Sequence, residues 1–169
     1  MKWSLKTRSL LFVTLQSGRM NTVKTPCIGI CSTTSLGDKI CRGCKRFGFE
    51  VINWNRYSED EKRAVLRRID QLTTQIMAER FRIFSLARLQ QALEDYRFFH
   101  DPEMSPYCWL HNLLQKRLYR IDSLQDIGAE LTPAYAGVDL RDLILEINQE
   151  LFTLSQAHFD RYFETHRMA

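Results

Sequence analysis

Four cysteines in one short stretch constrain this sequence more than any other feature. Cys27, Cys31, Cys41 and Cys44 follow the spacing C-x3-C-x9-C-x2-C within 18 residues. Packed thiolates repel one another and lose solvation, so a bound cation accommodates them best. Cys41 and Cys44 can wrap an ion in one tight turn, and Gly43 between them permits the backbone geometry of that turn. We therefore predict that all four cysteines are ligands of one metal ion.

The identity of the metal is less constrained than its ligands. Tetrahedral sulfur sites hold either zinc or iron, and this spacing differs from the common ferredoxin patterns. The spacing favours Zn²⁺, with an iron–sulfur cluster as the alternative and a pair of disulfides as a third reading. Secreted disulfide domains usually spread an even set of cysteines over the fold, whereas here Cys108 is a fifth and stands alone. The pattern predicts a reduced, cytoplasmic protein.

The charge is divided unevenly along the chain. Residues 1–57 hold ten Lys and Arg against two acids, a net +8, and residues 58–169 hold 14 against 18, a net −4. Four thiolates around one ion leave the site negative, so nearby cations would screen it. The residues predicted to surround the metal are Lys39, Arg42, Gly43, Lys45 and Arg46. Alternatively, the basic segment contacts nucleic acid.

Aromatic side chains directly follow the last cysteine and allow two interpretations. In the first, Phe47 and Trp54, together with Arg56, form a surface on which a partner or nucleic-acid bases stack. In the second, Phe49, Ile52 and Trp54 form a small core that joins the cysteine segment to the first long helix. A segment this short needs such a core, so the second interpretation is favoured.

Helical patterns fill the rest of the chain. Ser58 and Glu61 form a predicted capping box, and apolar residues then recur at helical spacing as far as about Phe99. A bend is expected near Thr73-Thr74, because β-branched residues are poor helix formers. Further helices are predicted over about 106–124 and 139–166, with a loop at 128–138 between them. No strong strand alternation is found.

These patterns predict a mostly α fold: a small irregular four-cysteine metal knuckle followed by a bundle of three to four helices. Residues 1–19 are expected to be a disordered tail or a mis-called start. We call residues 20–57 the knuckle and residues 58–169 the helical body. No apolar run approaches the ~20 residues that span a bilayer, so no membrane partner is expected.

Other candidate sites in the body are weak. Cys108 and His111 lie three residues apart on one predicted helix and could be ligands, but a buried Cys beside a surface His is the commoner arrangement. The sequence has no Ser/His/Asp arrangement, phosphate-binding glycine loop or H-E-x-x-H motif. We predict no catalytic residues, and an enzyme is the less favoured reading.

The knuckle and the first helical turns resemble a known family. The matching residues are Pro26-Cys27-Ile28, Cys31, Cys41-Arg42-Gly43-Cys44-Lys45-Arg46, Glu50-Val51-Ile52, Trp54 and Ser58 through Leu66. Over about residues 24–70 the chain is similar to the YdhL-type bacterial family, a four-cysteine domain of unknown function often labelled a predicted iron–sulfur protein. The resemblance implies a bacterial source and no established activity, and it implies nothing about residues 71–169.

Three functions are therefore in competition. The favoured one is a non-enzymatic binding module, in which a metal folds the knuckle and the helical body docks a protein partner or self-associates. The alternatives are an iron–sulfur redox carrier or sensor, and a nucleic-acid-binding accessory protein that uses the basic knuckle. A structural site with four protein ligands has no open position for a substrate, which argues against metal catalysis.

Overall fold

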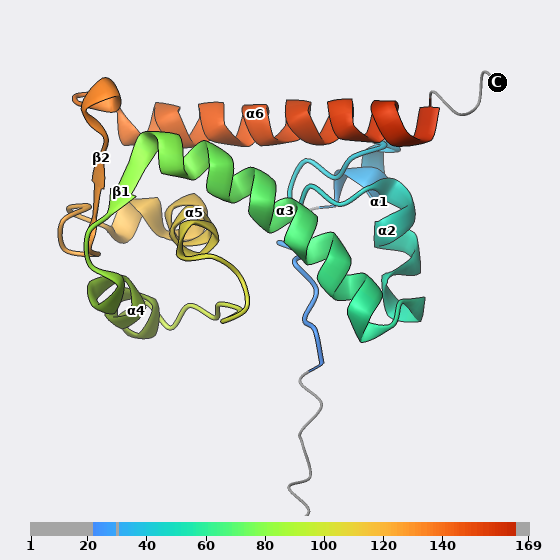
Figure 1. Ribbon diagram of the computed structural model, residues 1–169, viewed down its shortest axis with the longest axis horizontal. Coiled ribbons are helices and arrows are strands. Elements are labelled where there is room, and N and C mark those ends of the chain that lie inside the picture. The colour runs from blue at the N-terminus through green and yellow to red at the C-terminus, as the bar shows by residue number, and fades with distance from the viewer. Residues whose placement is uncertain (1–21, 30, 165–169) are drawn as a thin grey trace, which may run out of the picture.

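Helices dominate the protein, and the predicted mostly α fold is confirmed. A computed structural model describes residues 22–29 and 31–164, and 62% of these described residues are helical. The helices are α1 (Ser32–Leu36), α2 (Gly48–Asn53), α3 (Glu59–Arg80), α4 (Leu86–Asp95), α5 (Pro106–Arg117) and α6 (Leu140–Phe159), with the strands β1 (Phe81–Ile83) and β2 (Ala129–Leu131) (Figure 1). Short helical turns are η1 (Trp54–Arg56), η2 (Leu118–Arg120), η3 (Pro133–Tyr135) and the π-helical η4 (Asp160–Glu164).

The capping box that was predicted at the start of α3 is present. The Ser58 hydroxyl accepts from the Glu61 amide at 3.3 Å, and the Glu61 carboxylate accepts from the Ser58 amide at 2.8 Å. α3 then runs through Thr73-Thr74 as one helix, and the Thr73 hydroxyl donates to the Ile69 carbonyl at 2.8 Å. This bond satisfies a buried hydroxyl inside the helix.

The long helical segment predicted to reach about Phe99 is interrupted after Arg80 and resumes as α4, which ends at Asp95. Residues Phe81–Ile83 leave the helix and pair antiparallel with β2, with Phe81 opposite Leu131 and Ile83 opposite Ala129. Phe81 is fully buried and Arg82 is exposed, the alternation of a half-buried strand. The segment 128–138, predicted to be a loop, therefore contributes the partner strand.

The helix predicted over about 106–124 is shorter than expected, whereas the last predicted helix matches as far as Glu164. α5 ends at Arg117 and continues only as the 3₁₀ turn η2, not to residue 124. α6 starts where it was predicted, with the Asp139 carboxylate accepting from the Arg141 and Asp142 amides at 2.9 and 3.1 Å. α6 ends at Phe159 and η4 extends it to Glu164, whereas the rest of the predicted span, to residue 166, lies outside the described residues.

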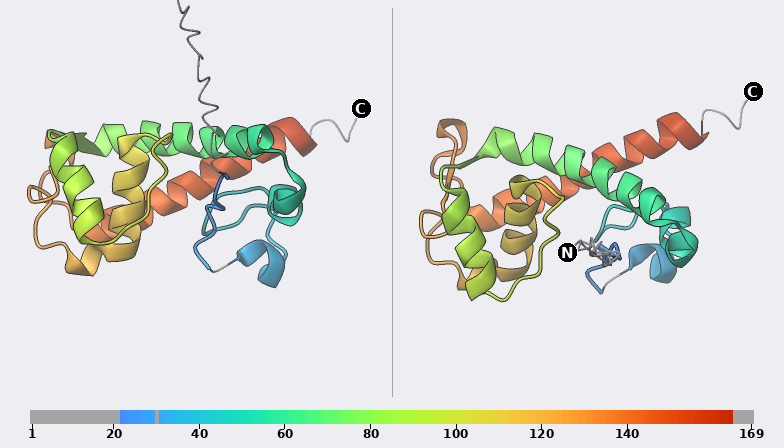
Figure 2. Two further views of the ribbon diagram at one scale, coloured as in Figure 1. Left: turned by 90° about the horizontal axis from the view of Figure 1, so that it is seen from below. Right: turned by 60° about the horizontal axis from the view of Figure 1, so that its bottom comes forward.

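The buried residues form two clusters, and α3 contributes to both. Ile76 and Met77 in its second half belong to the larger cluster, which lies between α3, α4, α5 and α6. Val65, Leu66 and Ile69 in its first half pack on Trp54 and Val23 of the knuckle. Figure 1 shows α6 lying along one side of the whole molecule, and both views of Figure 2 show α3 and α6 spanning the two parts.

A buried arginine ties α3 to α6. Arg80 is 5% exposed, and one guanidinium nitrogen lies 2.6 Å from Glu150 and 3.6 Å from Glu146. Its guanidinium also lies over the ring of Tyr135 at 5.2 Å. These partners offset the desolvation of a buried cation. Among the described helices, none is both long enough and apolar enough to cross a membrane.

Candidate metal centre

Cys41 and Cys44 lie at the tip of a tight turn. The Cys41 amide donates to the Arg46 carbonyl, and the Lys45 amide donates to the Cys41 carbonyl, both at 2.8 Å. Ile40 and Phe47 pair antiparallel on either side, and Lys45 adopts a left-handed conformation with φ 60°. The turn holds two buried thiols close enough to hydrogen-bond to one another.

The surroundings of the Cys41 sulfur favour a thiolate. Burial raises the pKa of Cys41, but hydrogen bonds from the Cys44 and Gly43 backbone, the Cys44 thiol and the Ser32 backbone outweigh it and lower the pKa to about 7. Such hydrogen bonds stabilise the charged form of a thiol, which is the form that binds metals. These hydrogen bonds therefore favour the thiolate form of Cys41, which can act as a metal ligand.

The Cys44 sulfur has an arginine as its main polar partner. Arg46 Nε donates to Cys44 Sγ at 3.3 Å, and this donor opposes the burial that raises the pKa of Cys44. Arg46 is 3% exposed and lies over the Trp54 ring at 4.7 Å. A buried guanidinium beside a buried sulfur can compensate the charge of a metal-bound thiolate.

The other two cysteines lie apart from this pair. Cys27 is exposed and its sulfur accepts from the Gly29 amide at 3.4 Å, while Cys31 is half-buried and directly precedes α1. All five cysteines carry free thiols. Within residues 22–29 and 31–164, no three His, Cys, Asp or Glu side chains are placed to hold one ion together. The structure thus brings two of the four predicted ligands together.

Two contacts connect the separate cysteines to the turn. The Ser32 hydroxyl, next to Cys31, accepts from the Arg42 amide at 2.9 Å, so the start of α1 adjoins the Cys41 turn. Cys27 and Cys44 line the same cavity. The donor chemistry of the four cysteines fits a soft metal, and closing the site requires Cys27 and Cys31 to move toward the turn.

The basic residues predicted around the metal differ in burial. Lys39 and Arg42 are exposed, and Arg42 Nε donates to Asp38 at 2.9 Å. Gly43 is half-buried, and its carbonyl accepts from Lys45 Nζ at 3.3 Å. Lys45 is 4% exposed, and its ammonium also donates to the Arg42 carbonyl at 2.5 Å. Lys45 therefore stabilises the turn by hydrogen-bonding to two of its carbonyl groups.

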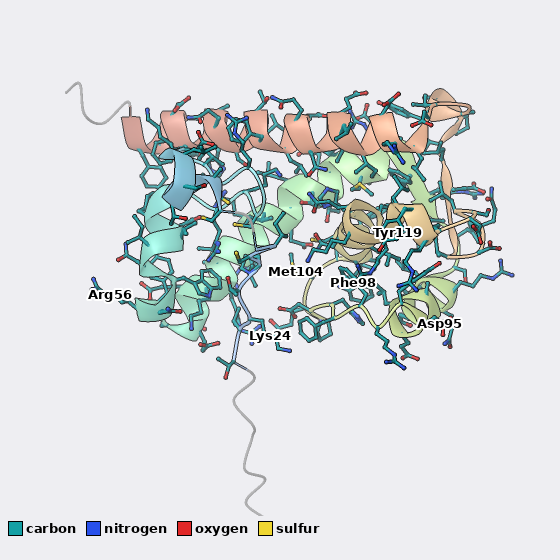
Figure 3. All side chains as sticks on the ribbon, turned by 180° about the vertical axis from the view of Figure 1, so that it is seen from behind. Lys24, Arg56, Asp95, Phe98, Met104 and Tyr119 are labelled. Carbon is teal, nitrogen blue, oxygen red and sulfur yellow. The ribbon has the colours of Figure 1, made fainter. Side chains whose placement is uncertain are left out.

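The aromatic residues of the knuckle are mostly internal. Trp54 and Phe47 are 6% and 2% exposed, so neither ring is open for stacking in this structure. Trp54 belongs to the cluster with α3, which agrees with the small-core interpretation, but Ile52, expected in that core, is 73% exposed. Arg56 is exposed and points away from the body in Figure 3.

Phe47 packs on α6 instead of on a partner. Its ring lies 5.3 Å from Phe159 and 5.5 Å from Phe163, and the Arg68 guanidinium lies over it at 3.7 Å. Arg68 also donates to the buried Glu50 at 2.6 Å, and Glu50 accepts from the Phe47 amide at 2.8 Å. Burial raises the pKa of Glu50, and Arg68 opposes this. These contacts join α2, α3 and α6.

His111 is the functional candidate whose surroundings the sequence did not reveal. It was expected on the surface but is 6% exposed, and its Nε2 has no hydrogen-bond partner among the described residues. Burial, and then the nearby Lys45, lower the pKa of His111 to about 4, so the ring is neutral. Its buried neighbours on α5, Leu110 and Leu113, were the only signal that this position faces inward.

Comparisons with known proteins match the cysteine segment and most of α3. Residues 25–73 match a family described as "Protein of unknown function (DUF1289)". The cysteine segment is YdhL-like. The uncharacterized protein YdhL of Escherichia coli (strain K12) and that of Shigella flexneri are each 49% identical over 45 residues, 27% of this chain and 54% of theirs. The chain spans about half the length of these curated relatives, and no solved structure matches it.

Proposed function

We propose that the knuckle binds one metal ion, Zn²⁺ in preference to an iron–sulfur cluster, through Cys27, Cys31, Cys41 and Cys44. The observation that carries the proposal is the Cys41–Cys44 turn, where buried sulfurs face one another and backbone hydrogen bonds favour the Cys41 thiolate. A buried thiolate is unfavourable without a cation, and Zn²⁺ with four sulfur ligands satisfies both charge and geometry.

The bound metal would organise the knuckle. Cys27 and Cys31 belong to a segment with little regular structure. Among the described residues from 22 to 39, only the five of α1 are helical. Ligation of both sulfurs would fix this segment on the turn, because metal binding and folding are coupled in small metal domains. Four protein ligands leave no open coordination position, so the role we propose is structural and the protein is a non-enzymatic interaction module.

Exposed apolar side chains near the junction of the knuckle and α6 support a site for a partner there. They come from α2 and from η4 after the end of α6, with Ile52 at 73%, Phe163 at 44% and Phe49 at 38% exposure. The Phe49 and Phe163 rings are 5.1 Å apart. Because exposed apolar clusters mark contact sites, we propose that a protein partner binds here, self-association being the competing result.

The nucleic-acid alternative has less support. Lys45 and Arg46, two of the cations that made the knuckle basic, are buried against the turn and Trp54. The two predicted stacking rings, Phe47 and Trp54, are also buried. A nucleic-acid surface needs accessible cations and exposed ring faces. Here two of the cations and both of the predicted stacking rings are buried.

Elemental analysis of the protein purified under reducing conditions without added metal tests the proposal. We expect about one zinc per chain and no visible absorbance of the kind that iron–sulfur proteins show. Cys41→Ser and Cys44→Ser should each lower the zinc content several-fold, because loss of one thiolate removes a quarter of the ligands. Cys108→Ala is the matched control, since this buried thiol lies on α5 and should leave the metal content unchanged.

Three results bear on the outcome. A brown protein that contains iron in place of zinc would support the same four ligands but favour the redox role over the structural one. Protein that contains neither metal, although its thiols are reduced and its knuckle is ordered, contradicts the proposal. Equal metal loss in Cys108→Ala and Cys44→Ser would also contradict the proposal. It would mean that metal binding does not depend specifically on the four cysteines of the knuckle.

A further inference from the structure

A cavity of about 680 Å³ lies between the knuckle and the helical body. Its walls come from residues 22–28, the 43–45 turn, the first half of α3, the connection 97–104 and one face of α5. Lys24, Phe98 and Met104, labelled in Figure 3, lie in this region between the two parts. The volume falls within the range of about 300–1,000 Å³ that is usual for small-molecule sites.

The cavity is lined by more positive than negative charge. Six cationic side chains line it against two acids, and one of those acids, Glu103, is already paired with Arg63. The cations are Lys24, Lys45, Arg63, Arg97, Lys116 and Arg117. Lys45 is committed to the carbonyls of its own turn, so the excess charge comes from the other walls. Such a lining attracts anions.

Two buried donors on the walls lack partners. His111 Nε2 and Arg117 Nε each make no hydrogen bond to any described residue, and both side chains line the cavity. The His111 side chain is more than nine-tenths buried, at 6% exposure. An unsatisfied buried donor costs about 1–3 kcal/mol, so it calls for an explanation such as a ligand. A neutral imidazole carries one N–H, which Nε2 can donate to an oxyanion.

Apolar and aromatic groups complete the lining. Leu66, Ile69 and Trp109 contribute apolar surface, and the Trp109 ring lies 4.6 Å from the His100 ring. The rim cations are held over aromatic rings: Lys24 Nζ lies 3.6 Å from the Phe99 ring centroid, and Lys116 Nζ lies 5.4 Å from that of Phe98. A cavity with apolar walls and a few donors fits a ligand that is itself partly apolar.

We propose that this cavity binds a small organic anion, whose phosphate or carboxylate accepts a hydrogen bond from His111 Nε2 and whose apolar part contacts Leu66, Ile69 and Trp109. The Lys116 ammonium supplies long-range attraction at the rim. The site goes beyond metal binding, because no cysteine is needed as a contact, although Cys27 and Cys44 share a wall with it. Because the cavity lies at the junction, a bound ligand would contact both the knuckle and α5.

Calorimetric titration of the full, metal-analysed protein with 1-naphthyl phosphate tests the proposal, with 1-naphthol and inorganic phosphate as partial ligands. We expect one site per chain for the naphthyl phosphate and weaker binding of both partial ligands. His111→Phe should reduce the affinity about tenfold or more, because a charge-assisted hydrogen bond is lost while the apolar volume is kept. Its melting temperature, measured on the same samples, shows whether the variant keeps the fold.

His158→Phe is the matched control, because this histidine packs against Phe47 outside the cavity and should leave the affinity unchanged. Lys116→Met, an exposed change, should weaken binding several-fold even if His111→Phe does not fold. Naphthol binding as tightly as its phosphate, equal affinity in the His111→Phe and wild-type proteins, or no binding at all would overturn the proposal. Zinc content measured on the same samples separates such a failure from failure of the metal site.

Discussion

His111 gives the protein a specific sensitivity to acid. The charged group that lowers its pKa is Lys45, and its polar neighbours are Asn112 and Asn148. Because the pKa is about 4 in the folded protein and about 6.5 in the unfolded chain, unfolding takes up a proton between these values. The stability associated with the neutral ring is complete above pH 6.5 and decreases as the pH falls toward 4, by on the order of 3 kcal/mol.

Urea unfolding of the wild-type and His111→Phe proteins between about pH 7 and pH 4 measures this effect. We expect the free energy of unfolding of the wild type to fall more steeply, because the variant lacks the group that gains a proton. Other titrating groups are common to both proteins, so the difference between the curves isolates His111. Parallel curves over that interval would mean that the buried ring is protonated in the folded state.

Single residues show what local sequence can and cannot predict. The capping box of Ser58 and Glu61 was predictable because its partners are three residues apart and its chemistry is local. The burial of His111 and the exposure of Ile52 depend on which elements pack beside them, and for His111 the apolar neighbours Leu110 and Leu113 are only an indirect sign of this. The cysteine turn was predictable in position, whereas it was not predictable that neither Cys27 nor Cys31 joins it to form a three-ligand group among the described residues.

At the scale of elements, Gly128 positions the two-stranded sheet. Its φ is +76°, and an added Cβ would collide with the Ser85 carbonyl oxygen and lie 2.8 Å from Arg88 Cβ. Its own carbonyl accepts from the Phe84 and Ser85 amides at 3.0 and 3.1 Å, at the turn from β1 into α4. Only glycine combines this conformation with so close an approach of two backbones.

Gly128→Ala should therefore destabilise the protein strongly, by about 3 kcal/mol or more, through strain and collision together. Gly137→Ala is the control, because Gly137 has a similar φ of +82° but open space around it, so only the strain of about 1 kcal/mol applies. Thermal or urea unfolding compares the two. Equal losses of stability would show that the contact with Ser85 is unimportant.

The same region explains the main error in predicting the elements. Phe81, Phe84, Leu86 and Leu89 recur at intervals compatible with a helix, so the periodicity of α3 continues across residues 81–85, which are not helical, into α4. The helix ends at Arg80 because the next residues pair with β2, where Leu131 lies opposite Phe81. Pairing across such a distance overrides local propensity, and short strands carry too few residues for an alternation signal.

At the scale of the whole molecule, the family match contains one of the two buried clusters except for Val23. It covers residues 25–73, and the knuckle-side cluster ends at Ile69, whereas the larger cluster begins at Ile76. The knuckle is nevertheless joined to the body by the Glu50–Arg68 ion pair and by the packing of Phe47 on Phe159. Loss of the proposed metal should therefore affect parts of α3 and α6 as well as the knuckle.

Hydrogen exchange of Cys44→Ser tests how far such a loss propagates. We expect faster exchange of amides in residues 32–57, in the first half of α3 around Val65–Ile69, and at the end of α6. Amides that pack in the larger cluster, on α4, α5 and the second half of α3, should stay protected, because Ile76 and Met77 contact other partners. Cys108→Ala should leave the knuckle protected. Loss of protection throughout α4 and α5 of Cys44→Ser would instead mean that the two clusters unfold as one unit.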